Sequence, residues 1–467
     1  MNTIEKFEKC IFFLIYIMHW VHSEGIYQNS SHICDTCKCS DGNSFIMDCS
    51  DQNFQHVLAN WPMNNKSLIA KFSNNNLTTL QLLPTSNQRA KLVFDHCKIK
   101  YIEGGVFSNM KNVEFIDLSY NFLTTEEIDG NNFKGPYNNS KFHPLPSLKY
   151  LNLAYNQIHS LPRKFFENMP NLEELDLEGN DFTVLDPQTQ LSIGTLTRLT
   201  VLNLANNELT EVEGEVLRNL SNLKKIDLSS NQLDFVPESL EYLGKTLQVL
   251  NLSENYIFQL NDKSFMGLNI RELHLNNLPR LESIGPNTFA TLHNLKKLHL
   301  FNNLNLKDID VEAFGKNQTL DELYLNNNSL KTIPFKLIYW SQLKILNIDG
   351  NPLECDCNLY NITKAVSTSV IKNMNYPICY DDEDKSIDIY LLNENNCKVK
   401  GHRFHIAQVS RHFDTMRTIL IILSTLLIIG TILTIVIGHL RYKKGLSLRS
   451  YPFVAQVSYN PITTEYI

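Results

Sequence analysis

Short apolar motifs recur at even spacing through the middle of the chain. The motif is L-x-x-L-x-L-x-x-N-x-L, as in LKYLNLAYNQI from Leu148 and LTVLNLANNEL from Leu199. Its L-x-L unit alternates apolar and polar positions, which predicts a short β-strand with one buried face. Twelve copies fit, eight closely and four more loosely, and they begin at Ser67, Arg89, Val113, Leu148, Leu172, Leu199, Leu223, Leu247, Ile270, Leu295, Leu320 and Leu343.

The spacing of these copies predicts how they assemble. The motif asparagine runs from Asn75 to Asn351, so the mean period is (351 − 75)/11, about 25 residues, which is the period of a leucine-rich repeat. One copy cannot bury its leucines alone, so stacked copies share a continuous core. We therefore predict a horseshoe-shaped leucine-rich-repeat solenoid, with a parallel β-sheet on the concave face and irregular or short helical segments on the convex side.

Two other residue types have predicted structural roles. The motif asparagine follows each strand, and its amide can hydrogen-bond backbone groups where the chain bends. Cys97 occupies this position in RAKLVFDHCKI, so we interpret it as a ladder residue rather than a reactive thiol. On the return segments we expect a second apolar ladder of phenylalanines: Phe107, Phe165, Phe265, Phe289 and Phe314.

Departures from the period mark irregular places. The step from Asn121 to Asn156 is 35 residues, and the extra residues lie in the polar stretch EEIDGNNFKGPYNNSKFHPLP. We expect a loop between two repeats, which is either a binding surface or a tolerated insertion. The copies at Ile270 and Leu295 should each bulge by one residue near the asparagine turn.

Both ends of the chain carry long apolar runs. Residues 10–20 are apolar and follow two lysines, which predicts a secretory signal peptide over residues 1–23. Residues 419–438 hold no charge and are long enough to cross a bilayer, so we predict a transmembrane helix over 418–440. Basic residues follow it, which indicates a single-pass type I protein of the plasma membrane with its N-terminus outside the cell.

Eight of the ten cysteines cluster near the ends of the repeat region. Cys10 lies in the predicted signal peptide, and two groups of four flank the repeats: Cys34, Cys37, Cys39 and Cys49, then Cys355, Cys357, Cys379 and Cys397. The C-x₂-C spacing also suits zinc, but a secreted context favours disulfides. Each group of four allows three pairings. The predicted organisation is then completed by an N-terminal cap at 24–66, repeats at 67–353, a C-terminal cap at 354–397, a linker at 398–417 and a cytoplasmic tail at 441–467.

The arrangement resembles that of extracellular leucine-rich-repeat receptors and adhesion proteins with cysteine-rich flanks. The resemblance rests on the repeats, the N-terminal C-x₂-C-x-C-x₉-C and the C-terminal NPLECDCNL. It implies four disulfides: Cys34–Cys39, Cys37–Cys49, Cys355–Cys379 and Cys357–Cys397. It also implies a protein that binds an extracellular protein ligand. A co-receptor or decoy without its own signalling domain, and innate immune pattern recognition, remain alternatives.

Composition narrows the classes further. The chain has 66 Leu and 54 Asn among 467 residues, a surplus that the repeat explains. The charge of 42 − 49 = −7 gives no basic footprint for nucleic acid, and 43% apolar content excludes intrinsic disorder. The chain contains none of the common catalytic or nucleotide-binding motifs, so we expect no enzyme and no cofactor.

Polar positions of the strands should face the concave side and are free to bind. We single out the aromatics Phe115, Tyr120, Tyr150 and Tyr155 and the acids Glu173, Glu174, Asp176 and Glu178. Phe115 should lie beside Tyr150, and Tyr120 beside Tyr155, about 4.8 Å apart. Together they fit a partner with an apolar centre and a basic rim, or they are ordinary cross-strand packing beside a solvated charged face. His274, His299 and Tyr324 form a second column, but no third ligand is evident, so we expect no metal.

The remaining motifs concern modification and the tail. Glycosylation sequons occur at Asn29, Asn65, Asn76, Asn138, Asn219, Asn251, Asn317, Asn327 and Asn361, all before the predicted membrane segment. In the tail, Tyr451 and Tyr459 begin sequences that resemble endocytic signals. The end Glu465-Tyr466-Ile467 resembles a ligand of PDZ domains, so a PDZ protein or an endocytic adaptor is a predicted partner.

Overall fold

The computed structural model describes residues 33–62, 65–316, 319–372 and 377–394. These residues belong to one compact unit. None of the helices among them is long and apolar enough to cross a membrane. The predicted signal peptide, transmembrane helix and tail lie outside the described residues.

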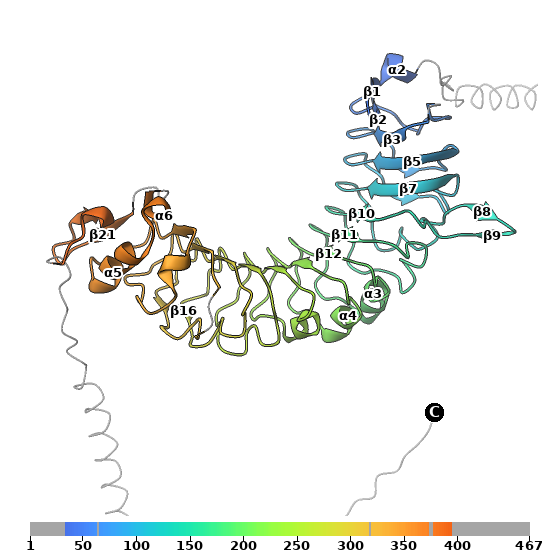
Figure 1. Cartoon of the computed structure of the whole chain (residues 1–467). Coiled ribbons are helices and arrows are strands. Elements are labelled where there is room, and N and C mark those ends of the chain that lie inside the picture. Colours follow the sequence, from blue (N-terminus) through green and yellow to red (C-terminus); the bar gives the residue numbers. More distant parts are fainter. Residues whose placement is uncertain (1–32, 63–64, 317–318, 373–376, 395–467) are drawn as a thin grey trace, which may run out of the picture. The chain divides into compact units, whose positions relative to one another are not determined.

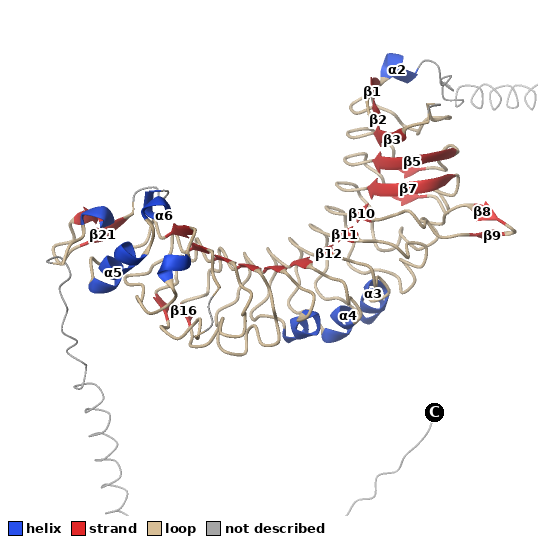
Figure 2. Ribbon diagram, viewed as in Figure 1, coloured by secondary structure: helices blue, strands red, loops and turns tan. Residues whose placement is uncertain are grey.

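A single sheet of 14 strands runs the length of this unit and lines its concave side (Figures 1 and 2). In this sheet, the first two strands come from the N-terminal cap and pair antiparallel with each other. Each later strand of the sheet pairs parallel with the strand before it. In order, the strands are β1 Lys38–Asp41, β2 Ser44–Asp48, β3 Ser67–Lys71, β5 Ser86–Val93, β7 Met110–Asp117, β10 Tyr150–Asn152, β11 Glu174–Asp176, β12 Val201–Asn203, β13 Lys225–Asp227, β14 Val249–Asn251, β15 Glu272–His274, β17 Lys297–His299, β19 Glu322–Tyr324 and β20 Ile345–Asn347.

The twelve strands from β3 onward correspond one to one with the twelve predicted repeats, so the predicted solenoid and its parallel sheet are confirmed. Most strands are three residues long, with a buried leucine or isoleucine between two more exposed residues. The register places these apolar residues directly beside one another, as in the pair Leu151 and Leu175. Residues at the same offset in successive repeats are therefore neighbours on the sheet.

The motif asparagines form the predicted ladder of amides behind the sheet. Asn231 is 4% exposed. Its Nδ2 donates to the carbonyl oxygens of Leu228 (3.1 Å) in its own turn and Leu204 (2.9 Å) in the preceding repeat, and its Oδ1 accepts from Leu209 N–H (3.0 Å). Such buried backbone groups would otherwise lack partners. Each amide therefore joins two repeats.

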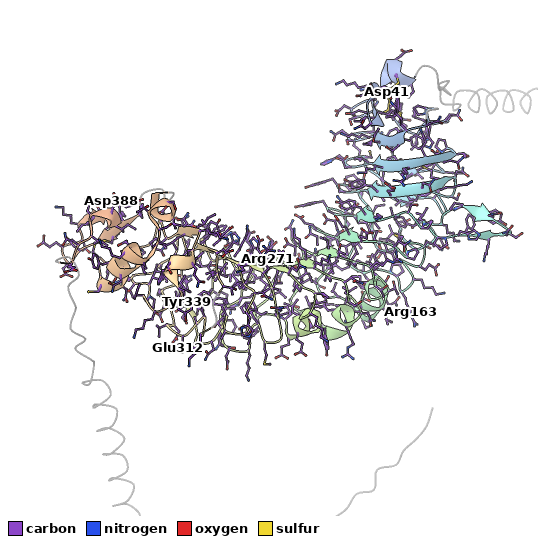
Figure 3. The ribbon with its side chains drawn as sticks, in the orientation of Figure 1. Asp41, Arg163, Arg271, Glu312, Tyr339 and Asp388 are labelled. Carbon is purple, nitrogen blue, oxygen red and sulfur yellow. A yellow bond between two sulfur atoms is a disulfide. The ribbon has the colours of Figure 1, made fainter. Side chains whose placement is uncertain are left out.

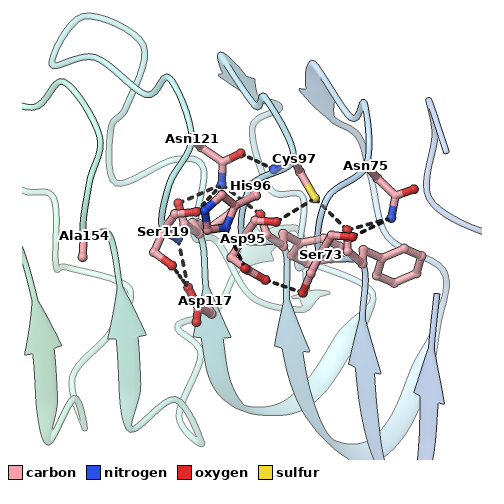
Figure 4. A network of polar contacts seen from close by, with 12 residues as sticks. Ser73, Asn75, Asp95, His96, Cys97, Asp117, Ser119, Asn121 and Ala154 are labelled. Carbon is pink, nitrogen blue, oxygen red and sulfur yellow. Dashed lines mark hydrogen bonds and ion pairs between the residues drawn. The ribbon is translucent and has the colours of Figure 1, made fainter. Parts of the chain in front are cut away.

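Cys97 takes the place of an asparagine in this ladder, as predicted. Its thiol donates to the Phe72 carbonyl oxygen (2.8 Å), and its backbone N–H donates to Asn121 Oδ1 (3.0 Å) (Figure 4). The side chain is fully buried. Burial raises the pKa of the thiol to about 12, so Cys97 remains a protonated donor at neutral pH.

One residue per repeat, directly before the ladder position, adopts a left-handed backbone with φ between 52° and 68°. Asparagine and glycine dominate this row, because they tolerate the left-handed region best. The members, which we call the left-handed row, are Asn74, His96, Tyr120, Tyr155, Gly179, Asn206, Ser230, Glu254, Asn277, Asn302, Asn327 and Gly350.

The irregular copies keep this row and add their extra residue after it. In the Ile270 copy Leu278 fills the ladder position, and the next buried leucine is Leu281, three residues on. The Leu295 copy keeps its asparagine, Asn303, followed by Leu306. In the other copies this step is two residues, so the predicted one-residue bulge is confirmed.

The convex side is built from short helices and two-stranded sheets (Figure 2). Figure 3 labels Glu312 on this side, opposite Arg271, which directly precedes β15 near the concave edge. The elements are α3 Pro187–Ile193, α4 Gly214–Arg218, η1 Glu238–Leu243 and η2 Trp340–Gln342, with the pairs β4 Thr79–Leu80 and β6 Tyr101–Ile102, and β16 Ser283–Ile284 and β18 Asp308–Ile309.

The phenylalanine ladder is divided into two stacks. Phe107 stacks on Phe133, which meets Phe165 edge-on. A separate stack joins Phe265, Phe289 and Phe314. The predicted second ladder is therefore present as two stacks, and between them the helices α3, α4 and η1 form the convex side.

The insertion between Asn121 and Asn156 is not an irregular loop. It contains an antiparallel hairpin of β8 Tyr137–Asn138 and β9 Lys141–Phe142, which projects from the stack in Figure 1. Asn139 and Ser140 both have positive φ, the geometry of a tight two-residue hairpin turn. Tyr137 packs edge-on against Phe142 across the hairpin. This pairing explains why a polar stretch forms strands.

Disulfides staple both ends of the solenoid. The structure joins Cys34 to Cys39, Cys37 to Cys49 and Cys355 to Cys379. These are three of the four pairs that the resemblance implies, and Cys397 of the fourth lies outside the described residues. The N-terminal cap also holds α2 Ile33–Thr36, and the C-terminal cap holds α5 Cys357–Ala365, α6 Thr368–Lys372, β21 Ile378–Tyr380, β22 Ser386–Asp388 and η3 Ile389–Leu391.

We predict that Asn231→Ala lowers the free energy of unfolding by about 2–4 kcal/mol, because it leaves buried backbone groups without partners. Asn222→Ala is the matched control, since Asn222 is exposed and donates one hydrogen bond, to the Thr197 carbonyl oxygen. We expect a loss within about 1 kcal/mol there. Denaturant-induced unfolding of the purified chain measures both. Equal losses in the two variants would contradict the role of the ladder.

Candidate functional site

The aromatic pair on the strands lies where the alignment of repeats predicts. Tyr150 pairs with Phe115 across β10 and β7. Their rings stack face to face, with centroids 4.3 Å apart and planes within 1°. Both side chains are half-buried on the concave face. They form a stacked apolar pair, which we call the platform.

A second aromatic stack lies just beyond the strands. The sequence placed Tyr120 and Tyr155 at strand positions. In the structure they follow the strands and belong to the left-handed row. Their rings stack at 4.3 Å, and His96, from the preceding repeat, stacks on Tyr120 at the same distance. Tyr120 is 45% exposed. The structure therefore extends the predicted pair to three rings, which we call the aromatic row.

The backbone under this row argues against a purely structural role. A bulky residue at positive φ is an outlier, and the left-handed region costs a non-glycine residue about 1–2 kcal/mol. An aromatic stack contributes about 0.5–1.5 kcal/mol of stability. Because this is similar to the cost of the left-handed backbone, the row adds little net stability. Gly179 follows in the left-handed row, and a Cβ there would lie 2.5 Å from the Tyr155 ring. The glycine leaves room for that ring to lie over it.

The predicted acids divide into paired and open carboxylates. Tyr155 donates its hydroxyl to Glu178 Oε1 at 2.6 Å, and this hydrogen bond, with burial, raises the pKa of Tyr155 to about 12. Glu173 accepts from Lys149 Nζ at 2.8 Å. Glu174, on β11 beside Tyr150, is exposed. Asp176 is half-buried, and burial raises the pKa of its carboxyl.

Carboxylates and amides alternate along the last residue of successive strands, an arrangement that the sequence analysis missed. The column, which we call the Asp/Asn column, is Asp117, Asn152, Asp176, Asn203, Asp227 and Asn251. Like charges directly opposite one another are destabilising, and the amides separate them. Each member also accepts a hydrogen bond from the backbone N–H two residues on, as Asp176 does from Glu178 (3.0 Å). The sequence signal for this column was the Asp or Asn that recurs as the middle residue of L-x-L, as in LNL and LDL.

The platform and the Asp/Asn column meet in a shallow hollow on the concave face. It is lined by Tyr150, Glu174, Leu175, Asp176, Val201, Leu202, Asn203, Lys225 and Asp227. Burial, with the nearby carboxylates of Asp176 and Asp117, raises the pKa of Tyr150 to about 12. The hollow is thus acidic and bounded by an aromatic ring, which suits a basic or amide-bearing side chain of a partner.

The second predicted column is also present, and it contains a third potential metal ligand. The rings of His274, His299 and Tyr324 stack at 4.2 and 4.6 Å. Glu272, two residues before His274, places Oε1 2.9 Å from His274 Nε2. The ligand atoms of Glu272, His274 and His299 all lie within 4.8 Å of one another. Glu272 is therefore a potential third ligand, which was not evident from the sequence.

The sequons differ in their surroundings. Asn65, Asn138, Asn219, Asn327 and Asn361 are exposed, and Asn76 is half-buried. Asn251 lies within β14, where its Nδ2 donates to Asp227 Oδ2 (3.0 Å). Asn29, Asn317 and the tail residues Tyr451, Tyr459, Glu465 and Ile467 lie outside the described residues.

Comparison with known proteins agrees with this geometry. A family profile described as "Leucine rich repeat" matches residues 130–182, 197–245 and 293–353. The chain carries leucine-rich repeats. It is related to extracellular leucine-rich-repeat proteins, and the repeats supply the scaffold for both stacked columns.

The similar proteins are longer than the part matched. "Transforming growth factor beta activator LRRC33" of Danio rerio is 25% identical over 412 residues, which cover 76% of this chain and 57% of that protein. Human "Podocan-like protein 1" is 30% identical, with 42% of this chain and 44% of that protein covered. "Chaoptin" of Drosophila melanogaster is 33% identical, with 33% and 12% covered. The chain thus spans less than two thirds of each relative.

We predict that Asp176→Asn makes the folded state more stable at neutral pH. The raised pKa means that the fold favours the protonated carboxyl, so the free energy of unfolding falls as pH rises from the ordinary pKa through the raised one. An amide removes this loss and keeps the hydrogen bond from Glu178, as Asn203 does from Ala205.

Thermal unfolding of the native chain and the variant at mildly acidic and neutral pH checks this. The variant should have the higher melting temperature at neutral pH, with the gap closing in acid. A variant that is less stable at neutral pH would contradict the assignment of an unfavourable buried charge.

Proposed function

We propose that the chain is a cell-surface receptor or adhesion protein that binds an extracellular protein ligand through the concave face around β7, β10 and β11. The observation that carries this is the aromatic row together with the Phe115–Tyr150 platform. Exposed aromatic clusters of this kind are enriched at protein-binding hot spots. The bulky left-handed residues support it, because unfavourable backbone retained at a surface points to function.

The chemistry of the face indicates the class of partner. The rings offer flat, rigid apolar contact, and the carboxylates of Glu174, Asp176 and Glu178 lie beside them. A ligand with an apolar centre and a basic rim complements this pattern. The Danio rerio relative is named as an activator of transforming growth factor beta, and this name supports a protein ligand here.

Membrane attachment belongs to the same proposal. The apolar segment 418–440 would anchor the chain with its repeats outside, and residues 441–467 would form a cytoplasmic tail. Two modes follow. In adhesion the repeats bind a partner on another cell; as a co-receptor or decoy, they bind a soluble ligand and any signal passes through a neighbouring protein.

Cell aggregation separates these modes. Cells that express the full chain should cluster, with one another or with a second cell type, if the function is adhesion. Complete absence of clustering, with normal surface expression and retained binding of a soluble ligand, would eliminate adhesion and leave the co-receptor mode.

Single substitutions in the aromatic row test the site. We predict that Tyr120→Asn and Tyr155→Asn each weaken ligand binding by about tenfold or more, since hot-spot residues carry more than about 1–2 kcal/mol. Stability should change by less than about 1 kcal/mol, because the lost stacking is offset by relief of left-handed strain. Binding of a ligand identified by proximity labelling on live cells is the measurement, with full-length variants on the cell surface.

Tyr256→Asn is the matched control, since Tyr256 is 47% exposed and lies after the ladder position, outside the left-handed row. It should bind as the native chain does. Native affinity in the Tyr120 and Tyr155 variants, at normal surface levels, would exclude this face.

A further inference from the structure

A cluster of two imidazoles and a carboxylate lies on the concave face, five strands beyond β10, which carries Tyr150 at the edge of the acidic hollow. Glu272 and His274 are two residues apart on β15, so both side chains project from the same face. His299 on β17 is the register partner of His274. Glu272 Oε1 lies 2.9 Å from His274 Nε2 and 3.6 Å from His299 Nε2.

These separations match the needs of a small tetrahedral ion. Zinc bonds to nitrogen and oxygen are about 2.0–2.2 Å, so two ligands of one tetrahedral ion lie roughly 3.3 Å apart. The two observed separations fall on either side of that value. Two imidazoles and one carboxylate are also a donor set that zinc takes in proteins, with a fourth position left open.

His299 provides an independent reason to look for a ligand. Its Nε2 is buried and makes no hydrogen bond among the described residues. A buried polar atom without a partner is unusual and calls for an explanation such as an ion.

We propose that Glu272, His274 and His299 bind a divalent transition-metal ion, Zn²⁺, on the concave face, with its fourth position open to solvent. The two imidazole planes are within 6° of parallel. Binding rotates both rings out of this stack, so that their Nε2 atoms converge on the ion beside Glu272 Oε1.

The surroundings leave the cluster accessible from one side. Tyr324 covers the outer face of His299, and its hydroxyl donates to Glu322 Oε2 (3.1 Å). Lys297 Nζ lies 3.2 Å from Glu322 Oε1, so this cation is paired there. The side chains of His274 and Glu272 are 25% and 29% exposed, so the ion enters past them. The site is separate from the aromatic row and does not depend on the proposed ligand.

Calorimetric titration of the full chain tests this. The chain, purified in detergent without a polyhistidine tag and stripped with a chelator, is titrated with ZnCl₂ alone. We expect one saturable site per chain. Loss of an outer-shell partner lowers metal affinity by about 10–100-fold. Glu272→Gln and His299→Gln each remove a direct ligand, so each should lower the affinity for Zn²⁺ by more than that. The control is His293→Gln, which removes an exposed imidazole from the segment between β15 and β17. This variant should bind Zn²⁺ as the native chain does.

A second readout uses Co²⁺, whose visible absorption reports tetrahedral ligation. Native chain and His293→Gln should give this spectrum, and Glu272→Gln should lose it while retaining the native circular dichroism and melting temperature. The absence of a saturable site in the native chain, or native affinity in folded Glu272→Gln, would overturn the proposal.

Discussion

The hydrogen bonding of the buried ladder position, an asparagine amide in ten of the twelve repeats, is the constraint on which the rest of the solenoid depends. After each strand the chain turns inward, and its backbone groups are buried where no sheet hydrogen bond reaches them. The ladder asparagine bonds groups in its own turn and in the preceding repeat, as Asn231 does with Leu228 and Leu204. It thereby fixes the register between repeats. Because of that register, side chains at equal offsets become stacked neighbours.

Much of this could be predicted from the sequence, because the strand and the ladder have a strict period and local signals. The twelve strands, the ladder role of Cys97 and the contact of Phe115 with Tyr150 follow from alignment alone. Other features could not. The hairpin β8–β9 is stabilised by a contact across its own turn, and the gap in the phenylalanine ladder depends on which helices fill the convex side. The sign of φ at Tyr120, and the orientation of Glu272 toward His299, depend on packing that an apolar pattern does not report.

The concave face carries two kinds of chemistry on one scaffold. Around β7, β10 and β11 it presents stacked rings beside carboxylates, and around β15 and β17 it presents imidazoles beside a carboxylate. Both are possible because the side chains on this face lie outside the leucine core and can vary without disturbing it. The leucines and asparagines that dominate the composition therefore specify the architecture, and the minority residues on this face specify what binds.

Site-specific photo-crosslinking on live cells tests the central claim most directly. A photoreactive phenylalanine analogue replaces either Tyr120, 45% exposed in the aromatic row, or Tyr242, 44% exposed in η1 on the convex side. The account predicts that position 120 captures a defined extracellular protein, and that Tyr155→Asn in the same chain abolishes this capture, whereas position 242 does not capture that protein. Equal capture from both positions, or capture that Tyr155→Asn leaves unchanged, would contradict recognition through the concave face.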